Sequence, residues 1–118
     1  MSIKGHPYRW FTSALRRGDL VGVRAAAVEL GHQVNLVDAL SIVLLMADRE
    51  DEAFERAATR WLARFVVERP AVGLEDLRCG LVALQALPAN GAAARQELAS
   101  LCERYRLDGV VGLLSASG

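Results

Sequence analysis

Three arginines spaced four residues apart form the best-defined polar pattern in the chain: Arg56, Arg60 and Arg64. On a helix, this spacing places three guanidinium groups on successive turns of one face, where they could clamp a phosphate backbone or an acidic partner helix. Glu52 and Glu68 continue the row at the same spacing. Because a row with both charges is also typical of an ordinary solvated helix face, that remains the alternative interpretation of these candidate partner-binding residues.

The histidines and cysteines are the other residues whose chemistry could serve catalysis or metal binding. His6 is expected before the first helix and His32 after the second, and neither has a carboxylate or a cysteine at i,i+4 spacing on a common helix face. Cys79 and Cys102 are expected on separate helices as buried, reduced thiols. The chain contains no CxxC, HExxH, GxSxG or P-loop motif. We therefore predict no enzyme, no metal site, no cofactor and no small-molecule substrate.

One apolar stretch, residues 36–47, is the segment around which the other elements must pack. Ten of its twelve residues are apolar, and only Asp38 and Ser41 interrupt them. A helix that is apolar nearly all round belongs in a core, and this one is shorter than the ~20 residues that span a bilayer. We expect a buried central helix with Asp38 and Ser41 as its narrow window to solvent.

The remaining sequence predicts five further helices around this one. We expect helices over residues 8–17 and 20–30, one that begins after the charged turn 48–52 and ends before Pro70, a fifth over 74–87, and a sixth that starts after Asn90. Pro7 suits the first position of the first helix, Asp19, Asn35 and Asn90 suit N-caps, and Gly31 suits a helix end. The apolar faces are read from helical spacing. They comprise Trp10, Phe11, Ala14 and Leu15; Leu20, Val23, Ala27 and Leu30; Phe54, Ala57, Ala58, Trp61, Leu62, Phe65 and Val66; Leu74, Leu77, Leu81 and Leu84; and Ala94, Leu98, Leu101, Cys102 and Tyr105.

Short connections at residues 18–19, 48–51 and 88–91 join these helices in pairs. Short turns make antiparallel neighbours, so the sequence predicts three αα-hairpins. The predicted fold is all-α, a compact bundle of about six helices in three αα-hairpins, with a short helical-repeat-like solenoid as its variant. At 118 residues, the chain is expected to form a single helical domain over 1–118, with a short, partly frayed C-terminal tail at 107–118.

Residues 23–42 also resemble the helix-turn-helix of bacterial regulators. The small, turn and apolar positions of that pattern are filled by Ala27, Gly31, Val37 and Leu40. The match would direct Gln33, Asn35 and Asp38 toward DNA bases. However, the second helix of this pattern has no basic residue, and His32 replaces the usual apolar residue after the turn. DNA binding is therefore the alternative function.

Three sequence segments carry a whole-chain resemblance: ALRRGDL, DAL-x-x-x-LLMA and FERAATRWLARF. Together they resemble small all-helical proteins of unknown function from GC-rich bacteria. The resemblance implies an all-helical, cytoplasmic protein, and it carries over no functional residue. A GC-rich genome also accounts for thirteen arginines against one lysine.

The composition favours a binding function over a catalytic one. Fourteen basic residues balance fourteen acidic ones, so no global field attracts nucleic acid or a membrane surface, and no N-terminal apolar stretch resembles a signal sequence. More than half of the residues are apolar, which is more than a domain this small easily buries. We expect a cytoplasmic, non-enzymatic protein-interaction module that binds a protein partner or a second copy. Tyr8, Trp10 and Phe11 of the first helix and residues 110–114 are further candidate contacts, with the alternative that these segments are simply the ends of the core closing over it.

Overall fold

The computed structural model describes residues 5–31 and 34–107, and within them six helices and no strand. The helices are α1 (Gly5–Arg17), α2 (Leu20–Leu30), α3 (Leu36–Asp48), α4 (Phe54–Glu68), α5 (Leu74–Ala86) and α6 (Gly91–Arg104). The predicted all-α fold is confirmed. In the described part of the chain, no helix has both the length and the apolar character needed to cross a membrane.

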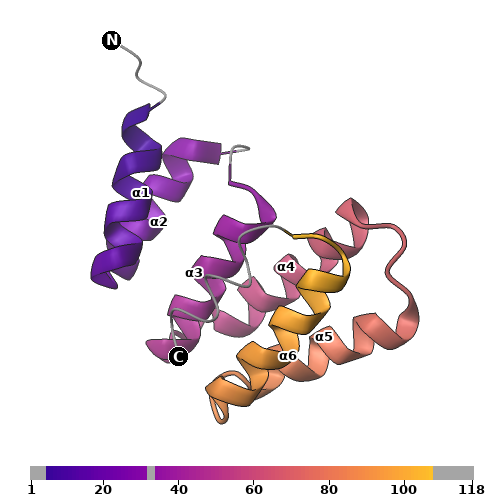
Figure 1. Ribbon diagram of the computed structural model, residues 1–118. Helices are drawn as coiled ribbons and strands as arrows, with labels where there is room; N and C mark the ends of the chain where they lie inside the picture. The colour runs from indigo at the N-terminus through magenta and orange to yellow at the C-terminus, as the bar shows by residue number, and fades with distance from the viewer. Residues whose placement is uncertain (1–4, 32–33, 108–118) are drawn as a thin grey trace.

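Three antiparallel hairpins follow one another along the chain: α1 with α2, α3 with α4, and α5 with α6 (Figure 1). The middle hairpin joins the other two, because α1 and α2 pack on α3 while α5 packs on α4. The resulting bundle measures 46 × 29 × 24 Å. The predicted three hairpins are therefore confirmed, in an elongated bundle whose first and third hairpins lie at opposite ends (Figure 1).

The helix ends follow the capping residues with two exceptions. The side chains of Asp19 and Asn35 accept hydrogen bonds from the backbone N–H groups of Gly22 and Asp38, at 3.0 and 2.8 Å, as predicted for N-caps. Asn90 precedes α6, but its side chain makes no capping bond. The first helix starts at Gly5, so the predictions that it starts at residue 8 and that His6 precedes it are wrong. Proline is tolerated throughout a first helical turn, whose N–H groups have no intrahelical acceptor.

Two separate hydrophobic clusters hold the bundle together. The large cluster joins α3, α4, α5 and α6, and its largest members include Leu40, Trp61, Phe65 and Leu98. The small cluster joins α1 and α2. Its buried members are Phe11, Ala14, Val23, Ala26 and Leu30. Because Ile42 and Leu45 of α3 pack against the small cluster while other residues of α3 belong to the large one, α3 forms part of both.

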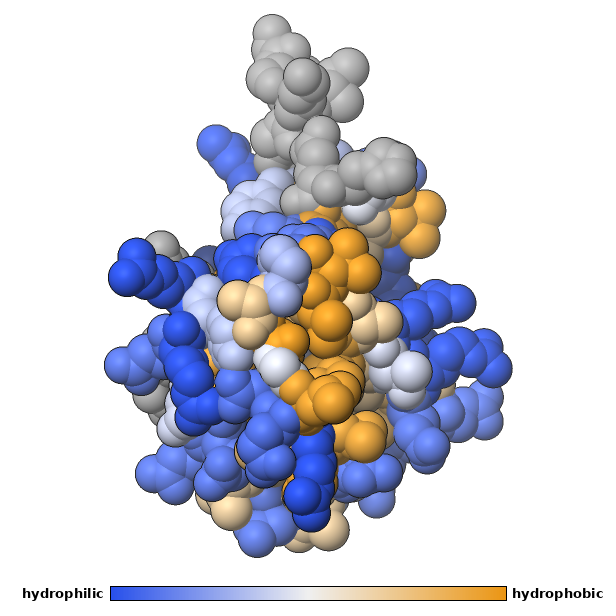
Figure 2. Space-filling view, turned by 90° about the vertical axis from the view of Figure 1, so that its right-hand side faces the viewer, coloured by the Kyte–Doolittle hydropathy of each residue, from blue (hydrophilic) through white to orange (hydrophobic). Residues whose placement is uncertain are grey.

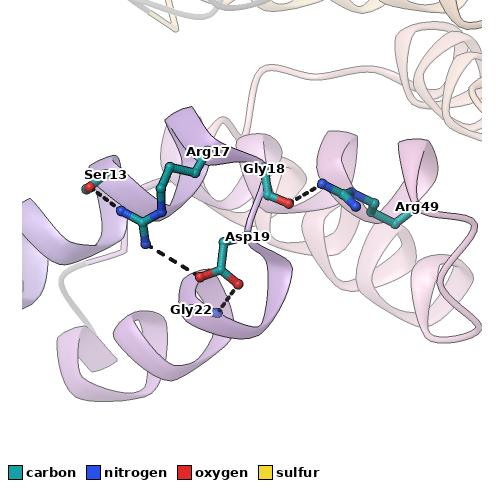
Figure 3. Close-up of polar contacts among 6 residues, drawn as sticks. All are labelled: Ser13, Arg17, Gly18, Asp19, Gly22 and Arg49. Carbon is teal, nitrogen blue, oxygen red and sulfur yellow. Dashed lines mark hydrogen bonds and ion pairs between the residues drawn. The ribbon is translucent and has the colours of Figure 1, made fainter.

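The turn between α1 and α2 is tied to the end of α3 by a polar contact (Figure 3). The guanidinium group of Arg49 donates a hydrogen bond to the carbonyl oxygen of Gly18. Gly18 has a φ of +69°, and a Cβ there would lie 2.8 Å from Nη2 of Arg49. The positive φ therefore favours glycine at this position, whereas the guanidinium group, at the end of a flexible side chain, could move aside for a Cβ. A second link joins Arg24 of α2 to Asp51 at 2.7 Å, where the hydrogen bond from Arg24 lowers the pKa of the Asp51 carboxyl.

Asp38 and Ser41 do not form a window to solvent, so that prediction is wrong. Asp38 is only 8% exposed and Ser41 only 6%. Ser41 tolerates burial because its hydroxyl donates to the carbonyl oxygen of Val37 at 3.1 Å. The partly exposed side of α3 instead includes the apolar residues Ala39 and Ile42.

The leucine face predicted for α5 is also wrong in part. Leu74 is 85% exposed and Leu81 is 47% exposed, while the buried residues of this helix are Gly80, Ala83 and Leu84. A Cβ on Gly80 would lie 3.0 Å from Cδ1 of Leu62 and 3.1 Å from Cδ2 of Leu101. The glycine therefore lets α5 pack closely against both α4 and α6. With this face of α5 buried, Leu74 and Leu81 point outward.

The other predicted apolar faces are correct in their main members. In α4 the buried residues are Ala58, Trp61, Leu62 and Phe65, and in α6 they are Ala94, Leu98, Leu101 and Cys102. In α1, Phe11 and Ala14 are buried, but Trp10 is 43% exposed, so its place on the buried face is wrong. Leu107, the first residue of the expected tail, is buried, and the rest of the tail lies outside the described residues.

Candidate partner-binding surfaces

A shallow groove between α3 and α4 brings two of the candidate arginines together. Its volume is about 220 Å³, and Arg60 and Arg64 line it beside apolar side chains of both helices. The apolar lining comprises Ala39, Ile42, Val43, Ala57 and Trp61. The groove therefore combines an apolar floor with two cationic groups one helical turn apart.

Trp61 fixes the floor of this groove. Its indole Nε1 donates to the carbonyl oxygen of Leu36 at 2.8 Å, which ties α4 to the first turn of α3. Its ring stacks on Phe65 with centroids 5.3 Å apart, and Phe65 meets the ring of Tyr105 edge-on at 5.7 Å. A floor built from a hydrogen-bonded, stacked tryptophan is rigid, so a bound segment would meet a preformed surface.

The third candidate arginine lies apart from the groove. Arg56 borders a different depression with Glu52, Ala53 and Glu55. Positions four residues apart on a helix differ by about 40° around its axis, so the row drifts from the outer surface toward α3. Arg64 makes an ion pair with Glu68, whereas Arg60 makes none with any residue that the structure describes. Arg56 also makes no ion pair with a described residue, but it does not line the groove, so Arg60 is the unpaired cation of the groove itself.

Tyr8 and Trp10 are exposed, as partner-binding residues should be, but they do not form one surface. They are 45% and 43% exposed. Residues two positions apart on a helix project about 200° apart around its axis, so the two rings lie on different sides of α1. The ring of Tyr8 stacks loosely on buried Phe11, with centroids 6.3 Å apart. Phe11 itself is fully buried, so the prediction that it contacts a partner is wrong.

The outward side of α5 is a surface that the sequence analysis missed. Leu74, Leu81 and Val82 are exposed on it, and beside it a groove of about 460 Å³ runs between α5 and α6. The floor of this groove is made of small side chains, including Ala83 and Ala94. The available sequence signal was the row of small and apolar residues Gly80, Ala83, Leu84 and Leu87, which marks the buried face and thereby the opposite, open one.

Apolar side chains also gather elsewhere on the surface. On the face that lies to the right in Figure 1, they form a band between hydrophilic side chains (Figure 2). Across the described residues, the exposed large apolar side chains are Tyr8, Trp10, Val21, Val28, Val67, Leu74, Leu81 and Val82. Three of these eight belong to α5.

The two cysteines have opposite environments. Cys102 is buried, and burial raises the pKa of its thiol to about 12, so it remains protonated at neutral pH. Cys79 is exposed on α5 beside the α5–α6 groove, so the prediction that it is buried is wrong. Its burial was expected because its neighbours in the sequence are apolar, but Leu74 and Leu81 among them are themselves exposed.

Two charged networks position α6. The carboxylate of Asp76 accepts hydrogen bonds from the guanidinium group of Arg104 and from the hydroxyl of Tyr105. That hydroxyl's bond to a carboxylate raises the pKa of Tyr105. Arg95 contacts both carboxylate oxygens of Asp48 at 3.2 Å, at the end of α3. These groups connect helices of the bundle, and we assign them a structural role.

The segment that resembles a helix-turn-helix does not offer an open recognition helix. Val43, Leu44 and Met46 are buried, and Ile42 and Leu45 are half-buried against the first hairpin. Gln33 and His32 lie outside the described residues. In the ranges 5–31 and 34–107, no three His, Cys, Asp or Glu side chains are grouped closely enough to hold a metal ion.

Comparison with protein-family models, with curated proteins and with solved structures gave no match to this chain.

Proposed function

We propose that the protein is a non-enzymatic protein-interaction module that binds an acidic, amphipathic helix of a partner in the groove between α3 and α4. The observation that supports this proposal is the position of Arg60 and Arg64 beside an apolar floor formed by Ile42 and Trp61. An amphipathic helix offers the matching pattern, with apolar side chains for the floor and carboxylates for the rim.

The spacing of the two arginines specifies the pattern of the partner. They are four residues apart, which corresponds to about 5.4 Å along α4. Glutamates at i and i+4 of a helix that lies along the groove have the same spacing, and arginine forms bidentate pairs with carboxylates. An apolar floor gains nothing from a phosphate backbone, so this groove favours a peptide over nucleic acid.

The test measures the affinity for a designed peptide. The probe is a fluorescein-labelled, helix-forming peptide with leucines along one face and glutamates at i,i+4 along the flanking face. Its counterpart has lysines in place of the glutamates. We expect the parent protein to bind the acidic peptide more tightly, and the R60E/R64E double variant to reverse this preference by about tenfold or more in Kd, measured by fluorescence anisotropy.

The matched control is Arg16→Glu, which changes an exposed arginine of α1 that does not line the groove. It should bind the acidic peptide as the parent does. Equal affinity of the parent for both peptides, or an equal loss in the Arg16 variant, would contradict the proposal. A labelled DNA duplex tests the alternative function: tight, salt-dependent binding that competes with the peptide would favour a nucleic-acid site instead.

A further inference from the structure

Helix α5 presents an apolar ridge to solvent. Leu74 is 85% exposed and Val82 is 56% exposed, with Leu81 beside them. Leu74, Arg78 and Val82 follow one another at steps of four, so they share the outermost line of the helix. The ridge runs along the groove of about 460 Å³ between α5 and α6. A ridge and a groove of small side chains thus lie side by side on one face of the third hairpin.

The charges around this face are of both signs. Arg78 belongs to the ridge and to the rim of the groove, and Glu75 and Glu97 also line the groove. Within the chain, Arg78 and Glu75 approach only to 4.0 Å, and their side chains are 76% and 78% exposed. An ion pair this exposed is weak, so Arg78 and Glu75 can each pair instead with a charged group of another molecule. A surface with both charges is complementary to itself, which is what a closed two-fold contact requires.

We infer that the occupant of this face is a second copy of the chain. The two α5 helices lie antiparallel across a two-fold axis, and the ridge of each copy enters the α5–α6 groove of the other. In this arrangement Arg78 of one copy meets an acidic residue on the rim of the second, Glu75 or Glu97. The inference goes beyond the proposed function, because none of the residues that line the α3–α4 groove belongs to α5.

The size of the contact limits its strength. Helix α5 has 13 residues and is therefore about 20 Å long. Stable dimers bury about 800 Å² per partner. A contact centred on one helix face of this length buries no more than about that area. We therefore expect a dimer that dissociates on dilution into the micromolar range, about 10⁻⁶ M.

Cys79 offers a direct test, because it lies on this face and the other cysteine, Cys102, is buried. The full chain is treated with a short bis-maleimide over a range of protein concentrations, and the products are separated on a denaturing gel. We expect a covalent dimer whose yield rises with concentration. The L74E/V82E variant should lose it by about tenfold or more and should sediment as a monomer. Cys79→Ser should give no covalent dimer but should still self-associate in sedimentation velocity.

The control is Val28→Glu, which places one such negative charge on an apolar position of α2 that is 79% exposed. It should dimerise as the parent does, and circular dichroism confirms that each variant is folded. A monomeric parent at high concentration would overturn the inference, as would an equal loss of dimer in Val28→Glu. Peptide binding by L74E/V82E separates the two proposals, since the α3–α4 groove should be unaffected.

Discussion

The two hydrophobic clusters differ in what holds them together. The large one contains aromatic rings in stacked and edge-on contact, Trp61, Phe65 and Tyr105, together with leucines from four helices. The small one has a single aromatic side chain among its buried members, Phe11, and two of the other four are alanines. Burial of apolar area is the main source of stability, so most of it belongs to the large cluster.

The first hairpin, α1 with α2, is therefore held to the rest of the bundle mainly by its contacts with α3 and the turn after it. It meets α3 through half-buried Ile42 and Leu45, and through the polar links from Arg49 and Arg24. Polar links at an exposed surface contribute little free energy. We infer that α1 and α2 open as a unit at a lower free-energy cost than α3 to α6, as cooperative subunits of small proteins commonly do.

The largest effect is expected from a change in the large cluster. Leu44→Asp buries a charge and removes a leucine that is 3% exposed, so it should unfold the protein. Trp61→Ala should lower the free energy of unfolding by about 3–5 kcal/mol. Urea denaturation followed by circular dichroism measures both. Unchanged midpoints would mean that the large cluster does not provide most of the stability.

Helical spacing alone predicted the buried face of α4 but not that of α5. In α4 the aromatic and leucine residues share one side and charged residues occupy the other, so only one face can be buried. In α5 leucines occur on two sides, and the choice between them is made by Gly80, which packs against Leu62 and Leu101. Such a contact depends on helices α4 and α6, so the sequence of α5 by itself does not reveal it.

The candidate site was predictable only in its charged part. The spacing of Arg60 and Arg64 places them on neighbouring turns, and the structure confirms that they lie together. The apolar floor beside the arginines is formed in part by the partly exposed side of α3, which includes Ala39. The sequence analysis predicted Asp38 and Ser41 on that side instead. The phase of a nearly all-apolar helix is poorly marked by its sequence, because almost any face could be buried.

A smaller and more local effect is expected in the small cluster. Phe11→Ala removes a fully buried ring, but it should cost no more than about 3 kcal/mol because the hairpin can detach without the rest unfolding. Hydrogen exchange should show lost protection in α1 and α2, with the amides of α4 and α6 unchanged. Equal loss of protection in all helices would show that the two clusters unfold as one unit.

A still smaller effect, with a defined pH dependence, is expected at Asp38 of α3. Its Oδ2 atom is buried without a hydrogen-bond partner among the described residues, and burial raises the pKa of the carboxyl. The folded state therefore binds the proton more tightly than the unfolded state, whose pKa is about 3.9. Stability is highest below that value and falls as the pH rises through the folded-state pKa.

Asp38→Asn should therefore be more stable than the parent at neutral pH. Below about pH 3.5 the two proteins should be about equally stable, because Asp38 is then mostly protonated in the folded and in the unfolded protein. Melting temperatures of the two proteins across this range give the comparison. Lower stability of the variant at neutral pH would show that the ionised carboxylate is favoured there, as it would be if its interaction with the N-terminus of α3 outweighed the cost of burial.

The smallest effect on stability is expected at the neighbour of Trp61. Arg60 is exposed and makes no ion pair with the described residues, so Arg60→Ala should change the free energy of unfolding by no more than about 0.5 kcal/mol. The groove that it borders includes Ala39, which packs on the large cluster, and Ile42, which packs on the small one. A marked loss of stability, measured by urea denaturation, would therefore show that this arginine helps to hold the two clusters together. An unchanged midpoint with weaker binding of the acidic peptide would separate the role of Arg60 in recognition from that of its buried neighbour in folding.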